Sequence, residues 1–271
     1  MPVREESGLK VWQRRERGRQ LAIWAGWLIG VTIFLYCFQL ISDKTIWFFV
    51  LDAGTQAGDL GSRMFPPQWS YVDQLWVPLW DTLNIATIGT AIAIVVAVPV
   101  AFLAARNTTP SVLFLRPIAL FIIVASRSIN SLIWALLLVA IVGPGEFAGI
   151  IAIGFRSIGF VAKLLYEAIE EIDPAQVEAV TATGAAKPQV LAYGIFPQIA
   201  PAFAGISVFR WDINIRESTI LGLVGAGGIG IQLNASVMEL AWSKVSVILI
   251  AILLTVVVSE WVSARIRHAI I

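Results

Sequence analysis

The chain has 271 residues, of which 58% are hydrophobic and only 14% are charged, with a net charge of +1 at pH 7. A soluble domain of this length has no need for so much apolar surface, so the composition predicts a membrane protein. The single cysteine, Cys37, excludes a disulfide framework or a thiolate metal site within one chain, and the single histidine, His268, lies in the C-terminal tail.

The apolar runs predict six membrane-spanning helices, each near the roughly 20 residues that cross a bilayer. A basic arm, residues 1–20, precedes the first run at 21–41, which is too long for a signal peptide and lacks a small-residue cleavage site. Residues 42–80 combine chain-breaking residues with many aromatic rings, which favours a segment along the outer membrane interface. The other spans are expected at 81–105, 116–142, 147–166, 199–223 and 245–264, in a core of residues 81–264 that is followed by a short tail, 265–271.

The distribution of Lys and Arg predicts the orientation of these spans. Six spans place both termini on the same side, and the segments on that side hold twelve Lys and Arg residues if Lys163 is counted at a helix end. The opposite side holds only Lys44, Arg63 and Lys244. By the positive-inside rule, we expect both termini of this multi-pass protein in the cytoplasm.

The third predicted span contains an arginine among polar residues. A charge at the bilayer centre costs about 2.5–3.5 kcal/mol even on lenient insertion scales, so Arg127 should face protein or water. It has no acidic neighbour within its own span, and the polar residues around it are Ser126, Ser128, Asn130 and Ser131. This arrangement suits the path of an oxyanion, although a partner on another helix could neutralise the charge.

A polar loop, residues 167–198, separates the fourth and fifth spans and carries strong signals for short helices. Asp173 is a good N-cap, and Gln176 three residues later completes a capping-box pattern. Gly184 suits a left-handed helix stop, and Pro188 can open a second short helix. The pattern indicates either a docking element at the membrane surface or a cytoplasmic loop that is simply helical.

The fifth predicted span is unusually rich in charged residues. At helical spacing, Asp212 and Arg216 form an i,i+4 pair in the favoured acid-first order, which predicts a structural ion pair. Arg210, Asn214 and Glu217 form a separate stripe on roughly the opposite face. These residues either line a translocation path or hold helices together, and the sequence leaves both alternatives open.

A glycine-rich stretch follows the fifth span and satisfies the G-x-G-x-x-G pattern. A dinucleotide site is excluded because no strand–helix unit surrounds it and no acidic residue follows about 20 positions later. We expect a tight backbone turn or close helix packing at the outer end of a pore. The glycines concerned are Gly225, Gly227, Gly228 and Gly230.

Several stretches resemble the permeases of phosphonate-type ABC importers. The coupling-loop motif of ABC-importer permeases runs from Glu-Ala-Ala through a glycine to a proline, and the matching residues here are Glu178, Ala179, Gly184 and Pro197. The segments 65–71, 126–129, 210–214 and 221–230 resemble the same family, so the resemblance covers roughly residues 65 to 235. Asn130 and Ser131 stand where that family commonly has Pro-Glu, which leaves phosphonate, phosphate and phosphite open as substrates.

The resemblance implies an all-α membrane protein with six transmembrane helices, the type I ABC importer permease fold with a cytoplasmic coupling helix, in the cell membrane. It implies a second copy of the chain, two ATP-binding cassette subunits and an external substrate-binding protein as partners, and no nucleic acid. Because the sequence lacks a GxxxxGK[ST] loop, we expect ATP and Mg to bind the ATPase subunits, and this chain to bind no cofactor and to be no enzyme.

Three alternatives compete with this interpretation. An ABC permease for another small solute would share every feature above. An ion-coupled secondary transporter would explain the acidic residues of the fifth span but leaves the coupling loop without a purpose. An intramembrane enzyme would need a cluster of His, Cys, Asp or Glu that the sequence lacks.

Overall fold

The computed structural model describes residues 3–6, 9–12 and 17–270, in two units, Met1–Ser62 and Arg63–Ile271. In the first unit, strand β1 (Val3–Glu6) pairs antiparallel with β2 (Leu9–Trp12), and helix α1 (Arg17–Lys44) follows. The parts of the expected basic arm at 1–2, 7–8 and 13–16 lie outside the described residues. Helix α2 (Trp47–Met64) occupies much of the expected interfacial segment.

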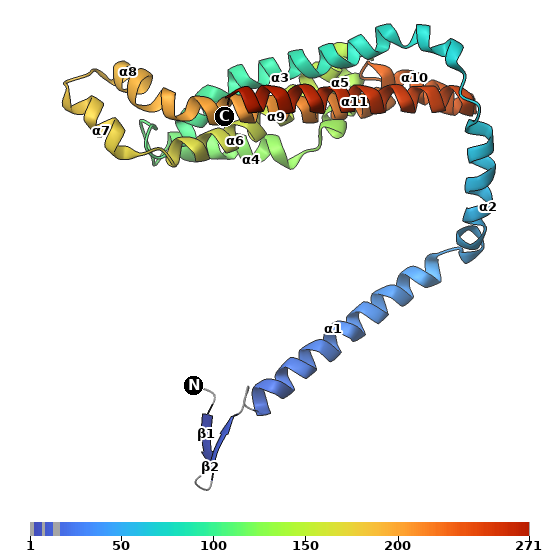
Figure 1. Cartoon of the computed structure of the whole chain (residues 1–271), viewed down its shortest axis with the longest axis horizontal. Coiled ribbons are helices and arrows are strands. Elements are labelled where there is room, and N and C mark those ends of the chain that lie inside the picture. Colours follow the sequence, from blue (N-terminus) through green and yellow to red (C-terminus); the bar gives the residue numbers. More distant parts are fainter. Residues whose placement is uncertain (1–2, 7–8, 13–16, 271) are drawn as a thin grey trace. The chain divides into compact units, whose positions relative to one another are not determined.

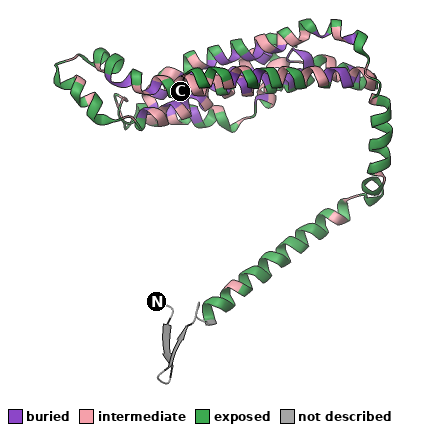
Figure 2. Cartoon of the chain, viewed as in Figure 1, coloured by how far each residue is buried: buried purple, intermediate pink, exposed green. Residues whose placement is uncertain are grey.

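Helix α1 contains the first predicted span, and its residues 18–44 are apolar and long enough to cross a membrane. None of these residues is buried within the structure, and most of them are exposed (Figure 2). Hydrophobic side chains along a helix of this length suit the hydrocarbon core of a bilayer.

The second unit is a bundle of helices (Figure 1). Its elements are η1 (Trp69–Gln74), α3 (Trp76–Ala104), α4 (Leu115–Ser128), α5 (Ser131–Val142), α6 (Glu146–Glu170), α7 (Pro174–Ala182), α8 (Lys187–Val190), the π-helix η2 (Leu191–Ile195), α9 (Phe196–Leu221), η3 (Gly222–Val224), α10 (Ile229–Met238) and α11 (Trp242–Ile270).

Helix α6 is the centre of this bundle and packs against α3, α4, α5 and α9, while α11 packs against α9. Small side chains let the backbones approach closely where the hydrophobic effect is weak. Alanines recur on one face of α3 and are fully buried: Ala86, Ala93, Ala97, Ala101 and Ala104. The buried residues follow the bundle axis (Figure 2), so the polar side chains that it also encloses are shielded from lipid.

The six predicted spans are confirmed in number. Five helical segments are long and apolar enough to cross a membrane, and α4 with α5 supplies a sixth if the bent pair counts as one span. The boundaries differ from prediction: the second span begins at Trp76, the fifth helix at Phe196, and α11 continues through the expected tail to Ile270.

The third span is not the continuous helix that we predicted over 116–142. Helices α4 and α5 meet at an angle of 86°. Asn130 causes the restart, because its extended backbone and its side-chain oxygen, which accepts a hydrogen bond from the Leu132 N–H at 3.1 Å, cap the first turn of α5. The polar residues of this span therefore lie at helix ends instead of in the middle of a helix.

Candidate functional site

The loop between α6 and α9 contains the predicted helix, α7, and its N-cap. The Asp173 carboxylate accepts a hydrogen bond from the Ala175 N–H at 2.9 Å, and Gly184 ends the motif with a left-handed φ of +79°. The predicted capping box is wrong, however. The Asp173 N–H donates to Gln198 Oε1 of α9 at 2.9 Å instead of to Gln176, because the loop folds back against the start of α9.

Gln198 ties the two ends of this loop together. Besides accepting from Asp173, its amide donates to the Gly194 carbonyl at 2.7 Å within the π-helix η2. Gly194 is buried, and a Cβ atom there would be in van der Waals contact with the Val177 Cα of α7, at 3.5 Å. The loop is thus one packed unit of α7, α8 and η2 that is hydrogen-bonded to the first turn of α9.

The outer surface of the loop presents the motif residues to the surroundings. Glu178, Ala179, Gly184 and Pro197 are all exposed, and the Glu178 carboxylate has no hydrogen bond or ion pair with the residues that the structure describes. A hollow of about 620 Å³ lies beside them; its lining residues are Ala179, Val180, Thr183, Gly184, Ala185, Gln189 and Tyr193. An exposed helix beside a hollow is a shape that another protein can engage.

A polar cluster lies inside the apolar bundle, at the contact of α3, α6 and α9. The Arg210 side chain is only 2% exposed, and its guanidinium forms an ion pair with Glu217 at 3.4 Å. Its Nε donates to Ser157 Oγ at 2.9 Å, and the guanidinium carbon lies 5.0 Å from the centre of the Phe160 ring. The buried charge of Arg210 is therefore compensated on several sides.

Asn214 extends this cluster to α3. Its amide donates to Thr90 Oγ1 at 2.7 Å and to Ser157 Oγ at 3.0 Å, and all three residues are buried. A translocation path was one of the two alternatives for Arg210 and Asn214. Both residues are buried in this conformation, so that role stays a prediction.

Glu217 is shared by two arginines. Besides Arg210, the Arg156 guanidinium of α6 lies 3.2 Å from the other carboxylate oxygen, and the Ser131 hydroxyl of α5 donates to Glu217 at 2.8 Å. Arg156 also donates to the Asn130 side-chain oxygen at 3.3 Å. The stripe predicted on the fifth span, Arg210, Asn214 and Glu217, did not include Arg156. The cost of a charge within the fourth span nevertheless indicates that Arg156 needs a partner.

Arg127 lies in the last turn of α4, beside the bend, and not in the middle of a span. Its side chain is exposed and forms no ion pair or hydrogen bond with any described residue. The aliphatic part packs against α6 at Gly159, where an added Cβ atom would lie 2.9 Å from Arg127 Cγ. The positive charge at this helix end is therefore uncompensated within the described part of the chain.

The hydroxyl groups beside Arg127 serve the backbone. Ser126 donates to the Phe155 carbonyl and accepts from the Gly159 N–H at 2.9 Å, which joins α4 to α6. Ser128 donates to the Val124 carbonyl one turn earlier at 2.8 Å. Their donor hydrogens are thus engaged, so Ser126 and Ser128 offer only acceptor lone pairs, which an anion does not bind.

Asp212 and Arg216 contact each other on the opposite face of α9. Asp212 is buried and also accepts a hydrogen bond from Ser259 of α11 at 2.9 Å, whereas the Arg216 side chain is 47% exposed. This pair therefore joins α9 to α11 and is separate from the Arg210 cluster.

The glycine stretch forms a tight turn between η3 and α10. Gly225, Gly227 and Gly228 have φ values of +84°, +89° and +73°, which side-chain-bearing residues rarely adopt. A Cβ atom on Gly230 would clash with the Thr219 carbonyl. The turn is anchored to α3, because the Ile229 N–H donates to Thr82 Oγ1 at 2.8 Å.

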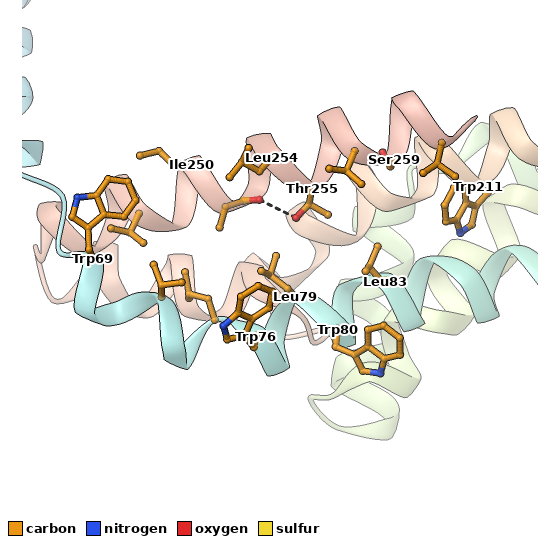
Figure 3. A pocket seen from close by; sticks show the side chains of 16 residues that line it. Trp69, Trp76, Leu79, Trp80, Leu83, Trp211, Ile250, Leu254, Thr255 and Ser259 are labelled. Atoms are coloured by element: carbon orange, nitrogen blue, oxygen red, sulfur yellow. Dashed lines mark hydrogen bonds between the residues drawn. The ribbon is translucent and has the colours of Figure 1, made fainter. Parts of the chain in front are cut away.

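An apolar groove of about 800 Å³ lies between α3 and α11 (Figure 3). Trp69, Trp76 and Trp80 are among the lining residues. The Thr255 hydroxyl donates a hydrogen bond to the Ala251 carbonyl of its own helix at 2.8 Å. The lining residues include no Lys, Arg or His, and most of them are apolar, so the chemistry of this groove suits lipid chains or another apolar surface better than an oxyanion.

Comparisons with known proteins agree with this geometry. Residues 97–270 match the family described as binding-protein-dependent transport system inner membrane component. The chain is 41% identical over 240 residues to a phosphite transport system permease protein of Stutzerimonas stutzeri, covering 89% of this chain and 86% of that protein. It is 39% identical over 214 residues to a phosphate-import permease protein of Mycolicibacterium smegmatis, covering 78% and 40%.

Among solved structures, the fold is similar to a chain of the inward-facing MetNI methionine ABC transporter. The TM-score is 0.65 at 22% identity, with 75% of this chain and 99% of that chain covered. A chain of a bacterial ABC transporter for the polysaccharide alginate gives a TM-score of 0.54 at 18% identity over 92% of this chain and 99% of that one.

Proposed function

The chain belongs to the family of binding-protein-dependent transport system inner membrane components, and we propose that its cargo is a phosphorus oxyanion: phosphite, a phosphonate or phosphate. In this role it is the membrane-spanning permease subunit of an ATP-driven importer. The similarity to a phosphite permease over most of both chains carries the proposal. The arginines inside the bundle are consistent with it, because guanidinium groups bind such oxyanions through paired N–H donors.

The exposed loop of α7 and α8 is the docking site for an ATPase in this proposal. ATP and Mg bind to that separate subunit, and the chain itself carries out no hydrolysis. Two copies of the chain form the pore above two ATPase subunits, and an external binding protein delivers the oxyanion at the opposite end of the bundle.

In this proposal the loop and both termini are cytoplasmic, which the positive-inside distribution of Lys and Arg supports. Closure of the ATPase pair then pushes on the loop. Because Gln198 links Asp173 and Gly194 to α9, this displacement reaches the helix that carries Arg210 and Glu217. The spans turn as rigid bodies between inward- and outward-facing states, which exposes the path to each side in turn.

The test is uptake of radiolabelled phosphite, phosphate and methylphosphonate into proteoliposomes that contain the chain with its ATPase and binding protein. We expect uptake of at least one of these anions that requires ATP on the cytoplasmic side and both partner proteins. Uptake that persists without the ATPase would instead identify an ion-coupled secondary transporter. ATP-dependent uptake of a different small solute alone would overturn the oxyanion assignment but not the importer.

A further inference from the structure

We propose that the Arg156–Glu217 ion pair is a resting contact that opens when an oxyanion enters, so that Arg156 and Arg127 hold the anion while Glu217 stays with Arg210. The inference rests on the proposed function and deepens it. It assigns the cargo to two specific arginines, and it makes Glu217 the anionic partner of Arg156 when no cargo is bound.

Glu217 can lose Arg156 without becoming an unsatisfied buried group. Its carboxylate still accepts the Ser131 hydroxyl at 2.8 Å and still pairs with Arg210 at 3.4 Å. The Arg210 guanidinium, in contrast, has no other carboxylate among the described residues. Of the two arginines, Arg156 is therefore the one that can leave, since a buried charge that loses its partner is strongly destabilising.

Arg156 is also the arginine that an anion can reach. Its side chain is 32% exposed, compared with 2% for Arg210. Both of its contacts, to Glu217 and to Asn130, use the same nitrogen, Nη1. A guanidinium has five N–H donors, so the Nε and Nη2 edge of Arg156, which makes no hydrogen bond to the described residues, is available for two-point binding of an oxyanion.

Arg127 supplies a second cation at the same helix crossing. Ser126, its chain neighbour, bonds to the backbone of Phe155 and Gly159, which flank Arg156 on α6. Together with Arg210 and Glu217, the two arginines leave two uncompensated positive charges. A phosphoryl group carries about −1.5 to −2 charges at pH 7, so one such anion balances this excess.

The exchange leaves neither Arg156 nor Arg210 without an anionic partner at either stage. In the resting state, Glu217 compensates Arg156; in the loaded state, the anion compensates Arg156 and Arg127. Release of the anion is favoured because Glu217 remains beside Arg156 and can form the ion pair with it again. A carboxylate that competes with the cargo keeps the binding reversible, as transport requires.

The experiment compares Arg156→Gln with a matched variant, Lys163→Gln, in proteoliposomes that contain the ATPase and the binding protein. Lys163 lies on the same helix, forms a 3.5 Å ion pair with Glu167, and loses the same charge on substitution. We expect Arg156→Gln to lower ATP-dependent phosphite uptake about tenfold or more, since a charged hydrogen bond contributes about that factor. Lys163→Gln should transport as the wild type does.

Arg156→Lys separates anion binding from a structural role, because lysine can pair with Glu217 at one point but lacks the bidentate fork. We expect Arg156→Lys to assemble with a wild-type melting temperature and to recover only part of the uptake. Full uptake in Arg156→Lys, or normal uptake in Arg156→Gln, would overturn the inference. A wild-type complex that moves no phosphorus oxyanion would overturn the proposed function itself.

Discussion

Replacing Glu217 by Gln tests whether the buried cluster is held by charge. The substitution keeps the shape of the side chain and can keep the bond from Ser131, but it removes the only carboxylate within reach of Arg210 in the described structure. Arg210 is 2% exposed, so water cannot replace that charge. Loss of one partner of a buried ion pair costs about 3–5 kcal/mol. For a domain of this size, such a loss lowers the melting temperature by roughly 6–20 °C.

The assay is thermal unfolding of the purified complex, followed by tryptophan fluorescence. Two double variants identify the arginine responsible. Glu217→Gln with Arg210→Gln should recover much of the lost stability, because no charge is then left buried, whereas Glu217→Gln with Arg156→Gln should recover little. A melting temperature unchanged in Glu217→Gln would refute the reasoning, and so would equal recovery in both double variants.

Three further predictions concern the loop and the remaining charges. Gly184→Val should uncouple ATP hydrolysis from transport, since valine is strained at a φ of +79°; substrate-stimulated hydrolysis at the wild-type rate would contradict this. Asp212→Asn should cost only about 1–2 kcal/mol, because Arg216 is half exposed, and adding Arg216→Gln should recover part of that loss in a thermal mutant cycle. Arg127→Gln should reduce uptake with assembly intact, and Arg127→Lys should restore part of it; failed assembly of Arg127→Gln, with normal transport by the complexes that form, would make the residue structural.

Much of the architecture was predictable from local patterns. The apolar runs of membrane-spanning length predict the six spans. In lipid, backbone N–H and C=O groups must be hydrogen-bonded within the chain, so each such run forms a helix. Asp173 and Gly184 are at the start and end of α7 for reasons contained in their own side chains and backbone preferences. The spacing of Asp212 and Arg216 likewise predicts their contact, since residues four apart share a helix face.

The sequence by itself thus determined the membrane-spanning helices, the capped loop and the pairs within one helix, because these depend on neighbours along the chain. Only the tertiary structure decided which charges meet across helices. Arg156, Ser131 and Glu217 come from three helices, and no local pattern joins them. Likewise, Gln198 takes the place of Gln176 at the N-cap of α7 because the fold brings α9 close. Long-range contacts of this kind depend on how helices pack, which periodicity along one chain segment does not encode.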